Sequence, residues 1–128
     1  MKKKLLAAVL CVAMVAATLV GCGSSDDGKK DGGKKSDLKV GVFYYTYADT
    51  YISSVRTALD KQLDDMGVDY QDYDGNSNQT TQNEQIDTAI QSGTNLLIVN
   101  IVTSGSNDAS TQVIEKAKAA DVPVIFFN

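Results

Sequence analysis

LKVGVFYY, residues 38–45, is the stretch that decides the fold. It is rich in β-branched and aromatic residues and nearly continuous in apolar character, which predicts a strand covered on both faces. Strands of this kind belong to parallel sheets, because the helices that connect parallel strands pack on both sides of the sheet. The segments that follow should therefore alternate between helix and strand.

Three segments with helical periodicity and three further apolar runs follow in alternation. Apolar residues that recur at spacings of three and four predict helices with one buried stripe each. The stripes are Ile52, Val55, Leu59, Leu63 and Met66, ended by Gly67; Ile86, Ala89 and Ile90, begun near Asn78 or Thr80 and ended by Gly93; and Val113, Ile114, Ala117 and Ala120, ended before Pro123. Strands are predicted over residues 68–73, 95–102 and 124–127.

This order, a strand followed by three helix–strand pairs, predicts an α/β fold with a parallel sheet and right-handed crossovers. We expect the doubly wound, flavodoxin-like strand order 2-1-3-4, because each face of the sheet needs an amphipathic helix. The sequence ends at Asn128, directly after the last predicted strand and without a helix to cover it. An open strand edge of this kind is unusual, so we expect residues 37–128 to be an incomplete lobe of a longer protein.

The start of the chain predicts a lipoprotein signal peptide over residues 1–21. Three lysines precede residues 5–20, a run of sixteen residues without a charge, which suits a signal-peptide core better than a membrane span. Residues 19–22 then read LVGC, a lipobox, so Cys22 is expected to carry a diacylglyceryl group. An uncleaved anchor helix is the alternative, and it is disfavoured because the apolar run is short and its carboxyl flank is not basic.

Residues 22–36 are predicted to form a flexible tether behind the lipidated Cys22. After the cysteine they contain only Gly, Ser, Asp and Lys, with no apolar side chain to bury. Residues 37–128 are then held on the extracytoplasmic side of the cell membrane by the lipid anchor.

The composition of residues 37–128 excludes several classes of function. Five Lys and Arg stand against thirteen Asp and Glu, a formal net charge of −8, which argues against nucleic acid and against an adhering membrane surface. After Cys11 and Cys22 the chain has no cysteine, and it has no histidine at all. Because no nucleophile or metal-ligand motif is present either, we expect no enzyme, no cofactor and no metal site in this part.

The candidate ligand site lies at the carboxyl ends of the strands, where open α/β sheets bind ligands. The polar and aromatic residues predicted there are Tyr45, Tyr47, Asp49 and Tyr51 after the first strand, Asp74, Asn76 and Asn78 after the second, Asn100, Thr103 and Ser104 around the end of the third, and Asn128 after the fourth. The set contains no cation and no glycine-rich loop for phosphate. Carboxylates and carboxamides that bond hydroxyl groups, with aromatic faces beside them, indicate an uncharged polyhydroxyl ligand.

Each of the four strongest candidates also has a structural interpretation. Asp49 can cap the helix that starts at Thr50. Tyr45 can cover the core at the strand end, and Tyr51 can belong to the apolar stripe. Asn100 interrupts the apolar run LLIVNIV and can bond a neighbouring loop, because a buried carboxamide needs partners.

Four motifs together resemble a known family. KVGVFYYTYADTYISSVR, QTTQNEQIDTAIQSG, LLIVNIV and VIEKAKAADVPVIFFN cover nearly all of residues 39–128. They resemble the N-terminal lobe of sugar-binding proteins of bacterial ABC transporters, which have the type I periplasmic-binding-protein fold, and within that group the galactose/glucose-binding branch.

The resemblance implies that Tyr45, Asp49 and Tyr51 bind a pyranose, with the Tyr51 ring stacked on one face of the sugar. Tyr stands there where the family usually has Phe, which leaves galactose, glucose or a related monosaccharide open. Asn100 falls on a strand-end asparagine that bonds a ring substituent. A second lobe, which in this family completes the site and often holds calcium, is not within this sequence.

The resemblance further implies a monomeric binding protein that closes two lobes around a monosaccharide and delivers it to an ABC permease in the membrane. The alternative is a sensor of the same fold that passes its ligand state to a membrane receptor or a histidine kinase. Export excludes a transcription repressor of this fold.

Overall fold

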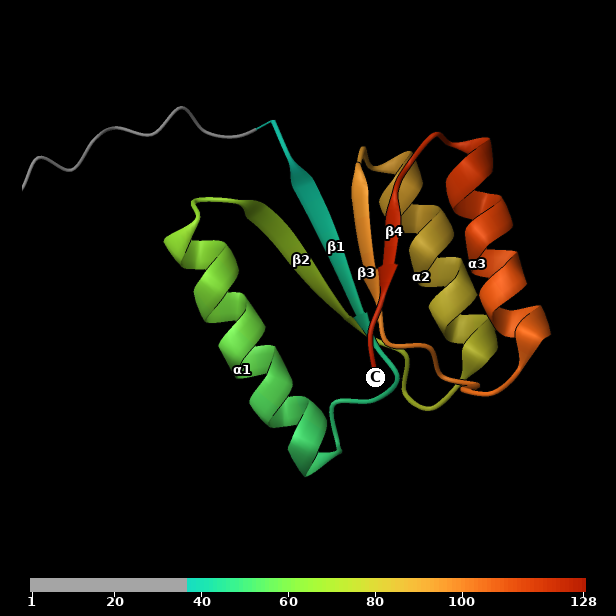
Figure 1. The fold of residues 1–128 in the computed structure, drawn as a ribbon, viewed down its shortest axis with the longest axis horizontal. Coiled ribbons are helices and arrows are strands. Elements are labelled where there is room, and N and C mark those ends of the chain that lie inside the picture. Colours follow the sequence, from blue (N-terminus) through green and yellow to red (C-terminus); the bar gives the residue numbers. More distant parts are fainter. Residues whose placement is uncertain (1–36) are drawn as a thin grey trace, which may run out of the picture. The chain divides into compact units, whose positions relative to one another are not determined.

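A four-stranded parallel sheet lies at the centre of the computed structural model, which describes residues 37–128 (Figure 1). The predicted signal peptide, Cys22 and the tether lie outside these residues. The elements are β1 (Lys39–Tyr44), α1 (Thr50–Asp65), β2 (Asp69–Asp74), α2 (Gln79–Gln91), β3 (Leu96–Val99), α3 (Asn107–Ala119) and β4 (Val124–Phe126). The strands lie in the order β2-β1-β3-β4, so the predicted doubly wound order is confirmed.

The central strand β1 buries both of its faces, as its composition predicts. It pairs with β2 from Lys39–Asp69 to Tyr44–Asp74 and with β3 from Val40–Leu96 to Phe43–Val99. Alternate side chains enter different cores because successive residues of a strand point to opposite faces. Val40, Val42 and Tyr44 face α1, whereas Phe43 faces α2 and α3. Figure 1 shows α1 on one side of the sheet and the pair α2 and α3 on the other.

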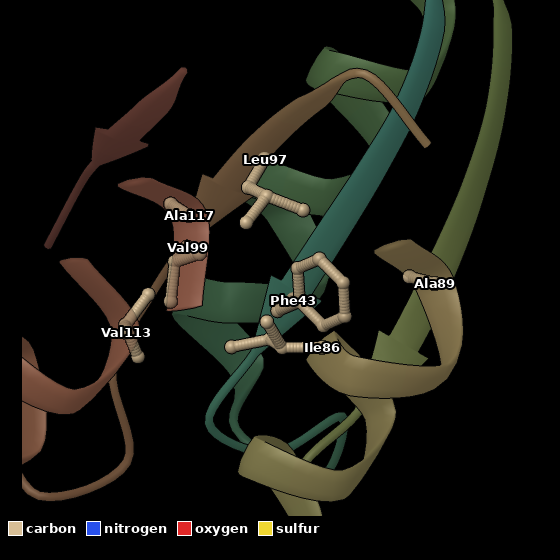
Figure 2. Close-up of a cluster of buried hydrophobic side chains, with 7 residues drawn as sticks. All are labelled: Phe43, Ile86, Ala89, Leu97, Val99, Val113 and Ala117. Atoms are coloured by element: carbon tan, nitrogen blue, oxygen red, sulfur yellow. The ribbon is translucent and has the colours of Figure 1, made fainter. Parts of the chain in front are cut away.

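The core on the α2 and α3 side of the sheet is built around Phe43. It joins β1 and β3 to the stripes of the two helices, and its buried members are Phe43, Ile86, Ala89, Leu97, Val99, Val113 and Ala117 (Figure 2). The ring of Phe43 also stacks on Tyr73 of β2, with ring centroids 4.6 Å apart. Phe43 therefore links three strands to α2, and the helical stripes predicted from Ile86, Ala89, Val113 and Ala117 are confirmed.

Local sequence signals set the helix boundaries. Asp49 caps α1, accepting a hydrogen bond from the Ile52 amide at 2.9 Å, and Asn78 caps α2, accepting from the Thr81 amide at 3.1 Å. Asn78 and not Thr80 thus begins the second helix. Gly67 follows α1 at φ +66°, a left-handed conformation that glycine adopts without a steric penalty.

Several boundaries differ from the prediction: β2 and β4 by a single residue, and Ala120, predicted in the third stripe, is the exposed C-cap of α3. Two further differences are larger. The periodicity predicts Met66 in the buried stripe of the first helix, but Met66 lies at the C-cap and is 67% exposed. The apolar run predicts a third strand that continues to Val102, but β3 ends at Val99. The backbone carbonyl of Asn100 accepts a hydrogen bond from the side chain of Gln82 and not from a neighbouring strand, so the ladder stops there.

Candidate functional site

The carboxylate of Asp49 is oriented by two hydrogen bonds at the start of α1. Oδ1 accepts the capping bond from the Ile52 amide, and Oδ2 accepts a hydrogen bond of 2.7 Å from the Tyr45 hydroxyl. The Ile52 amide and then the Tyr45 hydroxyl lower the pKa of Asp49 below its ordinary value, with a smaller contribution from the Tyr51 amide. Asp49 is therefore an ionised acceptor at neutral pH, and each oxygen keeps a free lone pair for a ligand hydroxyl.

Tyr45 and Tyr51 lie on either side of this carboxylate in the sequence and have different surroundings. Tyr45 is half-buried against the α1 core, and its hydrogen bond to Asp49 raises the pKa of its phenol. Tyr51 is 62% exposed in the first turn of α1. The interpretation of Tyr51 as part of the buried stripe is therefore wrong, whereas Tyr45 does cover the core as its structural interpretation predicts.

Asn100 connects three loops at the carboxyl edge of the sheet. Its Oδ1 accepts a hydrogen bond from the Tyr45 amide at 3.1 Å, and its Nδ2 donates to the Phe127 carbonyl at 3.2 Å. The side chain is buried, with 3% of its surface exposed. It bonds the neighbouring loops, as its structural interpretation predicts, and a direct contact of Asn100 with a ligand stays a prediction.

All four predicted site residues line one cavity at the carboxyl ends of β1 and β3. Its volume is about 330 Å³, and its lining is completed by Ile52, Ile101, Val102, Ser104 and Asn128. In Figure 1 this is the edge of the sheet where the chain ends. No lysine or arginine belongs to the lining, and Asp49 supplies a negative charge, so the cavity suits a neutral hydroxylated ligand better than an anion.

The loop after β2 does not reach this cavity, unlike the loops after β1 and β3. The Oδ1 of Asp74 accepts hydrogen bonds from the amides of Tyr47 and Asn76, at 3.1 Å and 2.8 Å, and Asn78 is used as the helix cap. Tyr47 is not part of the lining and lies beneath the guanidinium of Arg56, 4.0 Å from its ring centroid. These residues belong to the broader set of predicted candidates, and they support the loops of the site from outside.

The glutamines that hold the cavity wall are absent from the predicted site residues. Gln79 and Gln82 of α2 bond the backbone of residues 100–103. A signal is present in the sequence, since glutamine recurs at positions 79, 82 and 85 and so lies along one side of a helix. The sequence does not show, however, which loop such a stripe faces.

The described part of the chain offers neither a metal centre nor a membrane span. No group of three Asp, Glu, Cys or His side chains in residues 37–128 is arranged to hold a metal ion. Within the same range, no helix has both the length and the apolar character needed to cross a bilayer.

The fold agrees with the comparison to known families. Residues 40–128 match the family described as periplasmic binding protein domain. The chain belongs to this family. Proteins of the periplasmic binding protein family bind substrates and are not enzymes, and the resemblance noted in the four motifs is confirmed at the level of the family.

Individual relatives match the same part of the chain. The D-galactose/methyl-galactoside binding periplasmic protein MglB of Haemophilus influenzae is 33% identical over 94 residues, which are 73% of this chain and 28% of that protein. A solute binding protein of an ABC transporter from Mycobacterium smegmatis, with bound glycerol, has a TM-score of 0.63 at 25% identity over 70% of this chain and 30% of its own.

A third relative shares the fold at lower identity. An ABC transporter solute binding protein from Bacillus halodurans, with bound myo-inositol, has a TM-score of 0.65 at 18% identity and covers 75% of this chain and 32% of its own. This chain thus spans about a third or less of the length of these relatives.

Proposed function

We propose that this chain is the N-terminal lobe of a lipid-anchored, extracytoplasmic binding protein that captures a monosaccharide of the galactose or glucose type for an ABC transporter. The observation that carries the proposal is the cavity that joins the ionised carboxylate of Asp49, the exposed ring of Tyr51 and Asn100, without a cation. The likeness to MglB, whose name states galactose binding, supports the choice of sugar.

Each side chain has a distinct role in this proposal. Asp49 accepts hydrogen bonds from two adjacent sugar hydroxyls, because its two oxygens are oriented by Ile52 and Tyr45 and keep free lone pairs. The exposed Tyr51 ring packs on the apolar C–H face of the pyranose. Asn100, which lines the same cavity, bonds a ring substituent.

The proposed mechanism is closure of two lobes around the sugar. A cavity of about 330 Å³ that is open to solvent covers only part of a monosaccharide, and binding sites usually bury most of their ligand. A second lobe that covers the exposed Tyr51 face would complete the burial, and the closed form would dock on the permease.

Asp49→Ala tests the proposed sugar contact. In the full-length protein we expect the affinity for D-galactose or D-glucose to fall about tenfold or more, because a hydrogen bond to a charged acceptor contributes about 1.5–3 kcal/mol. Isothermal titration calorimetry measures the effect. Wild-type protein that binds no hexose and no pentose would contradict the proposed function.

Two control variants separate sugar binding from helix capping. Asn78→Ala removes the cap of α2, away from the cavity, and should cost about 1 kcal/mol of stability with unchanged sugar affinity. Asp49→Asn keeps a good capping residue but removes the charge, so it should lose affinity with little loss of stability. If both Asp49 variants bind sugar as the wild type does, Asp49 serves only as a cap.

The proposed lipid anchor predicts a specific modification of Cys22. Cells fed an alkyne-labelled fatty acid should incorporate the label into the wild type and into Cys11→Ala, whose substitution lies in the predicted signal peptide, but not into Cys22→Ala. Mass spectrometry of the mature protein should find Cys22 as its first residue. A mature protein that retains residues 1–21 would favour the anchor helix instead.

A further inference from the structure

Gln82 of α2 is completely buried, and its carboxamide bonds the backbone on both sides of Ile101. Its Nε2 donates to the Asn100 carbonyl at 2.9 Å, and its Oε1 accepts from the Val102 amide at 3.2 Å. A residue of a neighbouring parallel strand bonds its partner in the same manner, to the carbonyl before one residue and the amide after it. The side chain of Gln82 thus takes the place of a strand where β3 has ended.

Gln79, one helical turn earlier, extends this arrangement. Its Oε1 accepts a hydrogen bond from the Thr103 amide at 2.9 Å, and its Nε2 donates to the Oε1 of Gln82 at 3.2 Å. This bond from Gln79 holds the carboxamide of Gln82 in the orientation that its two backbone bonds require. Together the two side chains satisfy three backbone groups of residues 100–103, the segment that follows the end of β3.

The segment held in this way forms one wall of the cavity. Asn100, Ile101 and Val102 all line it. The position of Asn100 affects two other loops, because its side chain bonds the Tyr45 amide and the Phe127 carbonyl. A shift of the Asn100 backbone would therefore disturb the loop after β1, which carries Asp49, as well as the end of β4.

We infer that Gln82, supported by Gln79, is a positioning residue that holds residues 100–102 in the shape required for ligand binding. The inference rests on the proposed function only for the identity of the ligand. Gln82 does not line the cavity, so it acts through Asn100 and Val102 and not by contact with sugar.

The chain offers a matched control in Gln85, a third glutamine of the same helix. Its Nε2 donates to the carbonyl of Asp74 at 2.8 Å, so it also supports a loop at the carboxyl edge of the sheet. That loop, however, contributes nothing to the lining of the cavity. Gln85→Met therefore removes a comparable bond from the same helix without touching residues 100–103.

The experiment compares Gln82→Met, Gln79→Met and Gln85→Met in the full-length protein by two measurements. Amide hydrogen exchange, recorded without sugar, should show protection of Val102 and Thr103 reduced about tenfold or more in the first two variants and unchanged in the third. Calorimetry with D-galactose should show an affinity loss of about tenfold in the same two variants and a clearly smaller loss in Gln85→Met, whose loop supports the site only from outside. Gln79 is more exposed than Gln82, so its variant gives a result even if Gln82→Met does not fold.

The two measurements keep this inference separate from the proposed function. If the wild type binds no sugar but the exchange of Val102 and Thr103 increases in the Gln79 and Gln82 variants, the proposed function fails and the positioning of the loop stands. If the Gln79 and Gln82 variants match Gln85→Met in exchange and in affinity, the inference is wrong, and the glutamines are only polar members of the core.

Discussion

Phe43→Ala is expected to lower the free energy of unfolding by about 3–5 kcal/mol, the usual loss when a buried phenylalanine is truncated. Phe43 is completely buried and stacks on Tyr73 with an interplanar angle of 7°. Figure 2 shows Ile86 and Ala89 of α2 and Leu97 of β3 around its ring. Because the ring joins three strands to a helix, these neighbours cannot all move into the cavity that it leaves.

Urea unfolding of the full-length protein, followed by circular dichroism, measures this loss. Tyr51→Ala is the matched control, since it removes an aromatic ring of similar size that is 62% exposed. We expect that control to change stability by no more than about 0.5 kcal/mol. A loss below about 1 kcal/mol for Phe43→Ala would show that the α2 and α3 core is not packed as described.

Stability is also expected to fall as the pH rises from about 4 to about 7, because of a carboxyl pair between α1 and β2. One carboxyl oxygen of Asp60 and one of Asp72 are buried without another hydrogen-bond partner in residues 37–128. Burial, and then the charge of Asp60 and the hydrogen bond to it, raise the pKa of Asp72 to about 7, although Arg56 opposes the shift. A proton shared by the two carboxyl groups satisfies both.

The direction of the effect follows from proton binding. Between pH 4 and pH 7 the folded protein keeps the Asp72 proton whereas the unfolded chain has lost it, so folding is favoured most at low pH. The contribution is fully present below the unfolded pKa of about 4 and is lost as the pH rises through about 7. The whole shift corresponds to about 4 kcal/mol. Because Asp72 is only half-buried, we expect screening by water to reduce the effect to about 2 kcal/mol.

Three tyrosines and one arginine lie around Asp60 and Asp72, and none of them reverses the fall in stability with rising pH. Tyr44 of β1 is completely buried, and its hydroxyl has no hydrogen-bond partner in the described part of the chain. Burial and the two carboxylates raise the pKa of Tyr44, which keeps that phenol neutral. Tyr47 and Tyr70 also lie close enough to sense Asp72, and burial raises the pKa of each. Arg56 is the cation of the cluster.

Asp72→Asn tests the shared proton, because an amide donates permanently to Asp60. We expect the variant to be more stable than the wild type at pH 8 and to lose the decline between about pH 4 and pH 7, as measured by urea unfolding at a series of pH values. Asp69→Asn, at the exposed start of the same strand, should keep the decline. A wild type whose stability is level or rises across this range would rule out the shared proton.

Much of the fold could be predicted because its signals are local. The apolar run of β1, the stripes of the three helices and the caps at Asp49 and Gly67 depend on residues within one or two turns of each other. The end of β3 could not be predicted in this way. Val99, Ile101 and Val102 have the same apolar character, yet β3 ends at Val99. The next carbonyl, that of Asn100, is bonded by Gln82, which lies eighteen residues earlier in the sequence.

The candidate site could also be predicted only in part, because some of its features follow from topology and others from packing. Parallel strands place their carboxyl ends at one edge, so the topology alone brings Tyr45, Asp49, Tyr51 and Asn100 near one another. Whether each side chain faces the cavity or the core depends on packing. The exposed ring of Tyr51 and the two loop bonds of Asn100 were open alternatives until the tertiary contacts were known.

By itself, the sequence determined the α/β class, the order of the elements and the edge at which the predicted site residues gather, because periodicity and strand direction are properties of short segments. Only the tertiary structure decided that Gln82 replaces a strand and that Asp60 meets Asp72. Each of these pairings joins residues from different elements, and which groups meet is decided by how helices pack on the sheet. The burial that results gives Gln82 two backbone hydrogen bonds and raises the pKa of Asp72.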